Sequence, residues 1–327
     1  MKLLIPRGKL PVAMMAFLAL AVGCGDDEPG AAGPGTWSTH APLSLGPRQE
    51  MGVAALDGKV YVVGGIDGSR QAVATVEAYD PSTDRWTQRA SLPDPMHHVN
   101  LAAVGGKLYV VGALSGASFD ATGATLVYDP GADAWSPLTS MPSGTERGAS
   151  GVAVLDDGRI VVAGGLRGGD SVTEASLFDP GTDAWSPLQP LAVARDHLAA
   201  ANVGGRVYAA TGRDDGVLKA ALEVLDASTG SWSRRADIPT ARGGVAAGAL
   251  SGRLVVLGGE GNPADSAGIF HQTESYDPST DSWRTERSMQ TGRHGIGAAV
   301  VGNRLFVPGG ANREGFGAVT TNESFAY

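Results

Sequence analysis

The arginines of this chain are the residues whose type and spacing could do chemistry. Five of them recur at multiples of about 50 residues, and each comes just before an apolar segment. The five are Arg48, Arg147, Arg195, Arg242 and Arg293. A guanidinium presents several hydrogen-bond donors in one plane, so a ring of these groups would suit an anion. The spacing predicts an anion site if the fold brings the five side chains together.

A second set of charges follows the arginines in register. Four glutamates stand about 30 residues after an arginine, and they are Glu77, Glu223, Glu274 and Glu323. Where a sixth arginine would fall the chain has Met96, and the matching glutamate is replaced by Leu126. A buried charge left alone is costly, so the joint loss indicates pairs that neutralise each other. This interpretation makes most of the arginines structural.

Arg147 breaks the pattern because Ser176 stands where its glutamate should be. It is the best candidate for a cation free to bind a ligand, although Glu174 or Asp170 could neutralise it instead. Further candidate binding residues lie in polar segments that also have the composition of ordinary solvated loops. They are Arg167, Arg213, Asp214, His271 and Arg313.

The elements that must position these residues are marked by tryptophan. The chain has six, at Trp37, Trp86, Trp135, Trp185, Trp232 and Trp283, separated by 49, 49, 50, 47 and 51 residues. Each later Trp follows an aromatic or large apolar residue by seven positions, with a turn such as Asp80-Pro81-Ser82-Thr83-Asp84 between them. This spacing predicts a β-hairpin in which the two side chains face each other, repeated six times.

Each repeat has room for four antiparallel strands. In the first, one strand runs to Leu56, a second covers residues 59–63, a third covers 75–79 and a fourth holds Trp86. A glycine pair ends the second strand in four repeats: Gly64 and Gly65, Gly164 and Gly165, Gly258 and Gly259, Gly309 and Gly310. Six such repeats predict an all-β fold, a six-bladed β-propeller of four-stranded antiparallel blades.

The two ends of the chain predict how the ring closes. The sixth repeat reaches Tyr327 before any fourth strand, and Trp37 has no repeat in front of it. Placing Thr36 to Thr39 as the outer strand of the last blade completes both.

The glycine pair, the tyrosine, the Asp-Pro turn and the Trp together resemble the repeat of the Kelch family over residues 37–327. Ala113, Thr211 and Leu225 depart from that repeat in the second and fourth blades. Because strand direction alternates within a blade, the long second-to-third-strand loops are expected to share one rim with the connectors between blades. Loops that differ on a rigid scaffold are where binding usually resides, so any site is expected on that rim.

The first residues look like an export signal. Lys2, Arg7 and Lys9 precede an apolar stretch too short to span a bilayer, which ends at Cys24 in a run that resembles a bacterial lipobox. We expect a signal peptide at residues 1–23, a flexible tether at 24–35 and the propeller at 36–327. Lipid on Cys24 would anchor the exported protein, with the outer membrane favoured. The alternative is a soluble exported protein with an incidental cysteine.

Charge and cysteine usage exclude several classes of function. Removing the signal takes away three positive charges and moves the net charge from −9 to −12, which disfavours nucleic acid and leaves lipid as the membrane contact. Cys24 is the only cysteine, so the propeller has no thiol for the tyrosine–cysteine crosslink of Kelch copper oxidases. His97 and His98 are neighbours that would point apart, and the other histidines, at 40, 197, 271 and 294, show no ligand spacing. We expect no metal and no cofactor.

Two functions from different classes fit these observations. The favoured one is a non-enzymatic, monomeric envelope module that binds a protein, peptide or glycan on the long-loop rim. The alternative is an exported sugar-modifying enzyme, because bacterial sialic-acid mutarotases resemble the same six-bladed Kelch plan. That chemistry needs an acid–base group beside an arginine, for which Arg147 with Glu146 or Glu174 is the pairing to test. A third possibility is a structural part of a surface assembly.

Overall fold

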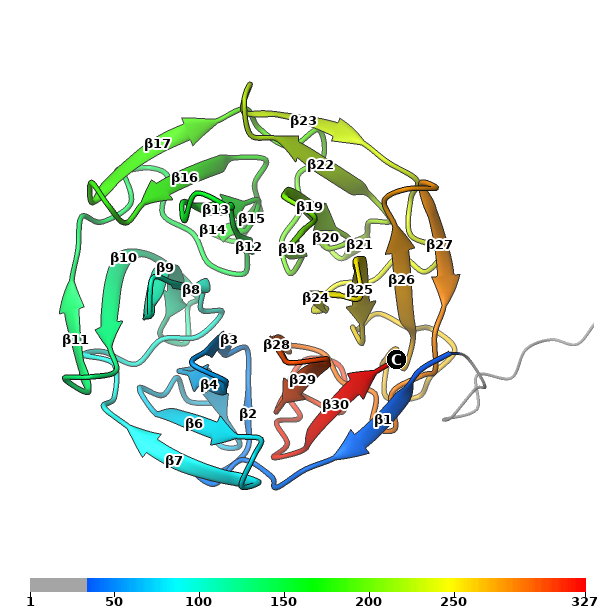
Figure 1. Ribbon diagram of the computed structural model, residues 1–327, viewed down its shortest axis with the longest axis horizontal. Coiled ribbons are helices and arrows are strands. Elements are labelled where there is room, and N and C mark those ends of the chain that lie inside the picture. Colours follow the sequence, from blue (N-terminus) through cyan, green and yellow to red (C-terminus); the bar gives the residue numbers. More distant parts are fainter. Residues whose placement is uncertain (1–33) are drawn as a thin grey trace, which may run out of the picture.

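The computed structural model describes residues 34–327 and contains only strands and their connections over that range. Six four-stranded antiparallel sheets stand around one axis as the blades of a propeller (Figure 1). The fold predicted from the repeats is therefore confirmed. The expected signal peptide, Cys24 and most of the tether lie outside the described residues. No helix between residues 34 and 327 is long and apolar enough to cross a membrane.

Every blade runs from an inner strand at the axis to an outer strand at the circumference (Figure 1). Blade one consists of β3 (Gly52–Leu56), β4 (Lys59–Val63), β6 (Val76–Asp80) and β7 (Arg85–Arg89). Blade two consists of β8 (Leu101–Val104), β9 (Lys107–Ser115), β10 (Asp120–Asp129) and β11 (Ala134–Pro137). Blade three consists of β12 (Gly151–Val154), β13 (Ile160–Ala163), β16 (Ala175–Asp179) and β17 (Ala184–Leu188).

The second half of the ring repeats this order. Blade four consists of β18 (Ala199–Val203), β19 (Arg206–Ala210), β22 (Leu222–Asp226) and β23 (Ser231–Arg234). Blade five consists of β24 (Ala246–Leu250), β25 (Arg253–Leu257), β26 (Thr273–Asp277) and β27 (Ser282–Thr285). Blade six consists of β28 (Ala299–Val301), β29 (Arg304–Pro308), β30 (Asn322–Ala326) and β1 (Thr36–Thr39).

Strand β1 closes the ring by adding to the outer edge of blade six, as the sequence predicts. It pairs antiparallel with β30, and Trp37 lies opposite Phe325 (Figure 1). The two rings are 5.5 Å apart, and the Trp37 indole donates to the carbonyl of Arg287 at 2.9 Å. Closure covers the edge of β30 that would otherwise be free and completes the fourth strand of blade six.

The other tryptophans hold each blade to the connector that enters it. In blade one Trp86 lies opposite Tyr79 and donates its indole N–H to the carbonyl of Ala41 at 2.8 Å. The carboxylate of Asp84 accepts from the Ala41 N–H at 2.8 Å and from the Tyr79 hydroxyl at 2.6 Å. We call this group, the aspartate and tryptophan that grip one connector residue, the outer clamp.

The outer clamp recurs wherever the turn sequence is kept. The equivalents are Asp133 and Trp135 on Ala90, Asp183 and Trp185 on Thr139, and Asp281 and Trp283 on Ala236. Blade four lacks it because Gly230 replaces the aspartate and Leu225 replaces the aromatic residue. Within residues 34–327 the indole nitrogen of Trp232 finds no hydrogen-bond acceptor.

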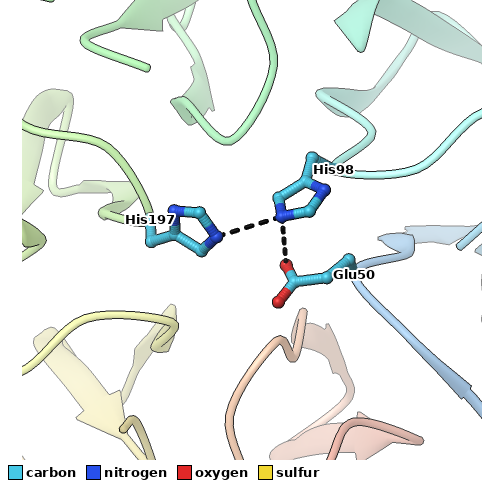
Figure 2. A group of neighbouring side chains, drawn as sticks. All are labelled: Glu50, His98 and His197. Carbon is cyan, nitrogen blue, oxygen red and sulfur yellow. Dashed lines mark hydrogen bonds and ion pairs between the residues drawn. The ribbon is translucent and has the colours of Figure 1, made fainter. Parts of the chain in front are cut away.

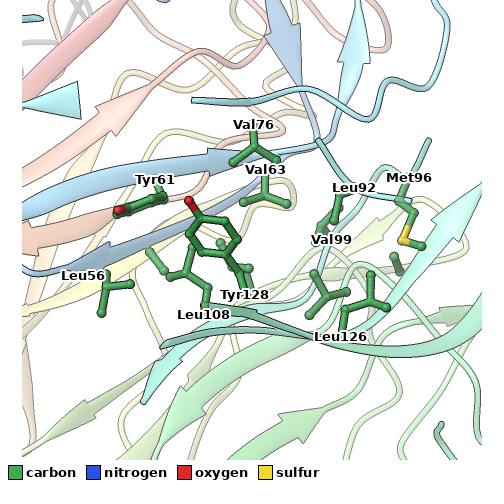
Figure 3. Close-up of a cluster of buried hydrophobic side chains, with 14 of the residues drawn as sticks. Leu56, Tyr61, Val63, Val76, Leu92, Met96, Val99, Leu108, Leu126 and Tyr128 are labelled. Atoms are coloured by element: carbon green, nitrogen blue, oxygen red, sulfur yellow. The ribbon is translucent and has the colours of Figure 1, made fainter. Parts of the chain in front are cut away.

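The hydrophobic cores lie between neighbouring blades. Figure 3 shows the cluster between blades one and two, where Tyr61 and Val63 pack with Leu108, Leu126 and Tyr128. Burying a side chain of this size contributes about 1.5–3 kcal/mol, so each pair of blades is joined by several such contributions. Small residues are needed nearer the axis because the inner strands converge there.

Several segments expected to be loops are short hairpins. In blade two β9 and β10 continue through residues 114–124 as one long hairpin with a bulge between Thr122 and Thr125. Two-residue pairs form in the same region of other blades: β2 (Arg48–Gln49) with β5 (Ile66–Asp67), β14 (Leu166–Arg167) with β15 (Asp170–Ser171), and β20 (Arg213–Asp214) with β21 (Val217–Leu218). The long-loop rim is therefore more ordered than its composition indicates.

Candidate functional site

The recurrent arginines are buried and do not form an open anion site. Four of them pair with the glutamate of their own blade, as the sequence pattern predicts: Arg48 with Glu77, Arg195 with Glu223 at 3.0 Å, Arg242 with Glu274, and Arg293 with Glu323 at 2.7 Å. All eight side chains are at most 3% exposed. These pairs tie the start of each blade to its third strand.

Arg147 is not the free cation that the missing glutamate suggested. Its side chain is fully buried, and it donates to the carbonyls of Thr145 at 2.7 Å, Val162 at 2.9 Å and Gly164 at 2.9 Å. A fourth bond, of 3.1 Å, goes to the hydroxyl of Ser176. Burial lowers the pKa of Arg147 to about 10, which still leaves it charged at neutral pH. The Ser176 hydroxyl stands where other blades have the carboxylate, and Arg242 in blade five donates to three equivalent carbonyls in addition to its glutamate. Arg147 is therefore held as the other arginines are, out of reach of a ligand.

The remaining candidate residues lie on the long-loop rim but not together. Arg167 pairs with Glu174, the residue proposed to neutralise Arg147. Asp214 lies 3.3 Å from Lys219. His271 Nδ1 donates to the carbonyl of Met289 at 3.2 Å, and Arg313 donates to the carbonyl of Phe316 at 2.8 Å. Only Arg213 points to the axis, where the structure gathers a different set of residues.

Six residues, one from each blade, form a closed ring of backbone hydrogen bonds around the axis. In each link the N–H of one residue donates to the carbonyl of its equivalent in the preceding blade, at 2.6–3.1 Å. We call this the axial ring, and its members are Glu50, His98, Ala149, His197, Gly244 and Gly295. All six have positive φ, between 49° and 68°, although only two are glycine. Such conformations are costly for other residues and persist where the surroundings fix them.

Three axial-ring side chains converge on one point (Figure 2). The Nε2 atoms of His98 and His197 are 3.0 Å apart, and a carboxylate oxygen of Glu50 lies 3.4 Å from His98 Nε2. The side chains of the two histidines are 2% and 4% exposed, and that of Glu50 is 10% exposed. Gly295 leaves room for this carboxylate, since a Cβ there would lie 2.4 Å from Glu50 Oε1.

Neighbouring groups fix the protons of these imidazoles. His97 Nε2 lies 3.0 Å from the carbonyl of Gly116, which can only accept, so this nitrogen carries a hydrogen. Burial lowers the pKa of His97 and holds that of His98 well below its ordinary value, so both are neutral. His97 Nδ1 is then an acceptor for the N–H of His98 Nδ1, while His197 Nδ1 donates to Asp196. The Nε2 lone pair of His98 is left facing Nε2 of His197.

Four further charged or titratable groups surround this point, Asp196 and Arg213 from blade four, Glu260 from blade five and His294 from blade six. Arg213 pairs with Asp196 at 3.3 Å and with Glu260, and its Nη2 lies 3.2 Å from His197 Nε2. His294 Nδ1 lies 3.2 Å from the other oxygen of Glu260. Burial by itself would raise the pKa of Glu260, but His294 and Arg213 hold it below its ordinary value. Counting Glu50, three carboxylates face one guanidinium.

The cavity on the axis at this ring is small. It has a volume of about 80 Å³ and is lined by all six axial-ring residues. A water molecule in the liquid takes up about 30 Å³, so the space suits an ion with a few waters. Pockets for drug-sized ligands are usually about 300–1,000 Å³, so a larger molecule would have to bind elsewhere.

A larger groove lies beside the axis on the long-loop rim. Its volume is about 490 Å³, and it is lined by loops of blades one, two and six that include Arg70, Pro95, His97, Phe119 and Phe316. Phe119 stands edge-on to His97, with ring centroids 4.7 Å apart. The Arg70 guanidinium lies 5.1 Å from the centroid of Phe316, in a cation–π contact.

Comparison with known proteins decides the family. The family model of the Kelch motif matches residues 47–93, 147–192 and 241–290, which correspond to blades one, three and five with their connectors. This chain is a Kelch-repeat propeller. The Kelch-like protein terF of Aspergillus terreus is 32% identical over 302 residues, covering 85% of this chain and 65% of the relative. Human Kelch-like protein 4 is 47% identical over 53 residues, covering 16% of this chain and 7% of the relative.

The comparisons cover only part of the relatives or have low sequence identity. The chain spans less than two thirds of the length of the curated Kelch relatives that it matches. A solved structure, that of YjhT, superposes with a TM-score of 0.71 over 88% of this chain and 99% of that one, at 19% identity. At that identity it shows that the propeller fold is shared.

The central cluster was missed by a search for ligand spacing along the sequence. His98 and His197 are 99 residues apart, which is two Kelch repeats, so no short-range motif connects them. The available signal was register, since each axial-ring residue stands two positions after the recurrent arginine or its replacement Met96. At that position blades one, two and four carry Glu, His and His, while the others carry Ala, Gly and Gly. The spacing argument against a metal therefore does not apply to this cluster.

Proposed function

We propose that this Kelch propeller is a non-enzymatic binding module that takes a protein, peptide or glycan on its long-loop rim. The observation that carries the proposal is the groove of about 490 Å³ formed by loops of blades one, two and six. Its volume falls within the range of about 300–1,000 Å³ that is usual for ligand pockets. Arginine and aromatic residues are enriched where interfaces gain most of their affinity, and Arg70, Phe119 and Phe316 provide them here.

Peptide and glycan arrays probed with the purified protein test this proposal and separate the ligand classes. Binding to members of one array is expected, and the double variant Phe119→Ala/Phe316→Ala should weaken it at least about tenfold, because two anchors of the groove are removed. Val217→Ala is the matched control, since Val217 is 60% exposed on the same rim in blade four. Array binding that the double variant leaves unchanged, or no binding to either array, would contradict the proposal.

A second candidate function is an exported sugar-modifying enzyme of the mutarotase kind. The observation that favours it is the polar cluster at the axis, where the Asp196–His197 pair lies beside Arg213 and could supply acid–base chemistry. The pairing of Arg147 with Glu146 or Glu174 no longer supports it, because Arg147 is buried. The axial cavity of about 80 Å³ disfavours entry of a whole sugar.

An NMR exchange experiment on the anomers of N-acetylneuraminate tests the enzyme directly. Interconversion that the protein accelerates, and that His197→Asn abolishes, would replace the binding proposal by the enzymatic one. An exchange rate equal to that of buffer is the result expected of a binding module.

We also propose that the module is exported and anchored by lipid on Cys24, in the outer membrane. The run from Leu20 to Cys24 supports this proposal. Fractionation of cells that express the full chain should place it with the membranes, and Cys24→Ala should release it to the soluble envelope fraction. A Cys24→Ala protein that stays with the membranes would argue against the lipid.

A further inference from the structure

The axial ring brings together three electron-pair donors, one of which, His197 Nε2, lies 3.2 Å from the guanidinium of Arg213. His97 and Asp196 lie within hydrogen-bond distance of the Nδ1 atoms of His98 and His197, and the Nε2 atoms of these two histidines face each other at 3.0 Å. The Glu50 carboxylate adds a third donor, and the three ligating atoms lie within 4.8 Å of one another. Such an arrangement is unfavourable unless a shared proton or a cation stands between the donors.

The spacing of these atoms suits a small metal ion. Two donors bound at about 2.0–2.1 Å to a tetrahedral centre are about 3.3 Å apart. The measured separations of 3.0 Å between the two histidine nitrogens and 3.4 Å between His98 and Glu50 already approach that value. Two histidines and one carboxylate form a ligand set that zinc sites use, with a water in the fourth position.

The surroundings provide what a metal site needs beyond its ligands. A carboxylate behind a ligating histidine orients the ring and increases its basicity, and Asp196 occupies that place behind His197. Three carboxylates, from Glu50, Asp196 and Glu260, outnumber the single guanidinium of Arg213. The cavity of about 80 Å³ accommodates an ion with water, and Ala149, Gly244 and Gly295 leave the other half of the ring open.

We propose that Glu50, His98 and His197 bind one late first-row divalent metal ion, with Zn²⁺ as the expected occupant. The ion lies on the propeller axis and ties blades one, two and four together through their side chains. The positive charge of Arg213 disfavours metal binding, because its Nη2 lies 3.2 Å from His197 Nε2. Arg213 must lose this contact when His197 Nε2 binds the ion. This site adjoins the loop groove, because His97 and Phe119 line the groove and both contact His98.

Isothermal titration of the purified full chain with Zn²⁺ tests the site. A Cys24→Ala background removes the one thiol that would add a competing ligand. One ion per chain is expected to bind, and Glu50→Gln, His98→Asn and His197→Asn should each raise the Kd at least about tenfold. Asn is chosen at the histidines because it tolerates the left-handed backbone of the ring. His271→Asn, a half-buried histidine on the same rim, is the control and should leave the Kd unchanged.

A second variant predicts an effect of the opposite sign. Arg213→Gln removes the opposing positive charge, so it should tighten Zn²⁺ binding by about tenfold. Circular dichroism checks that each variant is folded. If a histidine variant does not fold, the test of the metal site rests on Glu50→Gln, which keeps the size and shape of the side chain. The proposal is overturned if the chain binds no Zn²⁺, if Glu50→Gln binds as tightly as the parent, or if His271→Asn loses binding equally.

Discussion

The outer clamp lies at the circumference of the propeller and the axial ring at its axis, and they vary in opposite ways. The outer clamp keeps its side chains, because four blades use the same aspartate and tryptophan to hold one connector residue. The axial ring keeps only its backbone, with six residues of like φ linked in a circle, while its side chains change from Glu to His, Ala and Gly. Contacts repeated with the same side chains hold the propeller together. Positions such as those of the axial ring, where only the backbone conformation is repeated, can carry different side chains and so can form a site.

The largest effect should come from breaking one of the repeated buried ion pairs. Glu274→Gln leaves Arg242 charged and fully buried without its carboxylate, and the free energy of unfolding should fall by about 3–5 kcal/mol. Ser176→Ala in blade three is the matched change, because both arginines donate to three carbonyls but Arg147 meets an uncharged hydroxyl where Arg242 meets a carboxylate. It should cost only about 1 kcal/mol. Chemical denaturation measures both, and equal losses would show that the carboxylate is not what stabilises the other blades.

A smaller effect is expected at the outer clamp, and it should depend on pH. The N–H of Ala90 and the hydroxyl of Tyr128 hold the pKa of Asp133 below its ordinary value. The carboxylate therefore adds stability above its unfolded pKa of about 3.9, and this is lost as the pH falls through the lower folded value. Asp133→Ala should cost about 1 kcal/mol at pH 7 and progressively less below about pH 4. Denaturation at several pH values checks this, with Asp120→Ala in the same blade as the control.

The smallest effect on stability should come from a change in the axial ring, and the same change should lower the affinity for Zn²⁺. Gly295→Ala places a Cβ where Glu50 Oε1 now lies, so the carboxylate must turn away. Four other ring members keep the same backbone with a Cβ, so the cost in unfolding free energy should be about 1 kcal/mol. Zn²⁺ affinity should fall by about tenfold, whereas Gly244→Ala, whose nearest contact is the Cβ of His294, should leave it unchanged. Equal affinities in the two variants would argue against Glu50 as a ligand.

This contrast explains how much could be predicted from the sequence. The Trp spacing, the turns and the glutamates that accompany the arginines each occur four to six times, so they predicted six blades, the closing strand and four ion pairs. Arg147 was misjudged because three of the groups that bind it are backbone carbonyls, whose direction no residue type reveals. Glu50, His98 and His197 were missed because the prediction relied on residue types that recur. These three share one position of the repeat, but the side chain there changes from blade to blade.

The pairing of β1 with β30 has a consequence for the order in which the molecule can form. The two strands are nearly 290 residues apart in the chain, so the earliest-made strand waits for the last-made one before it can be hydrogen-bonded. Blades one to five contain only local pairings and need no such wait. Because a long loop must be closed before a distant contact is gained, we expect blade six to be the final piece to assemble. Shortening β1 or β30 should then leave a propeller in which blades one to five are formed and blade six is not closed.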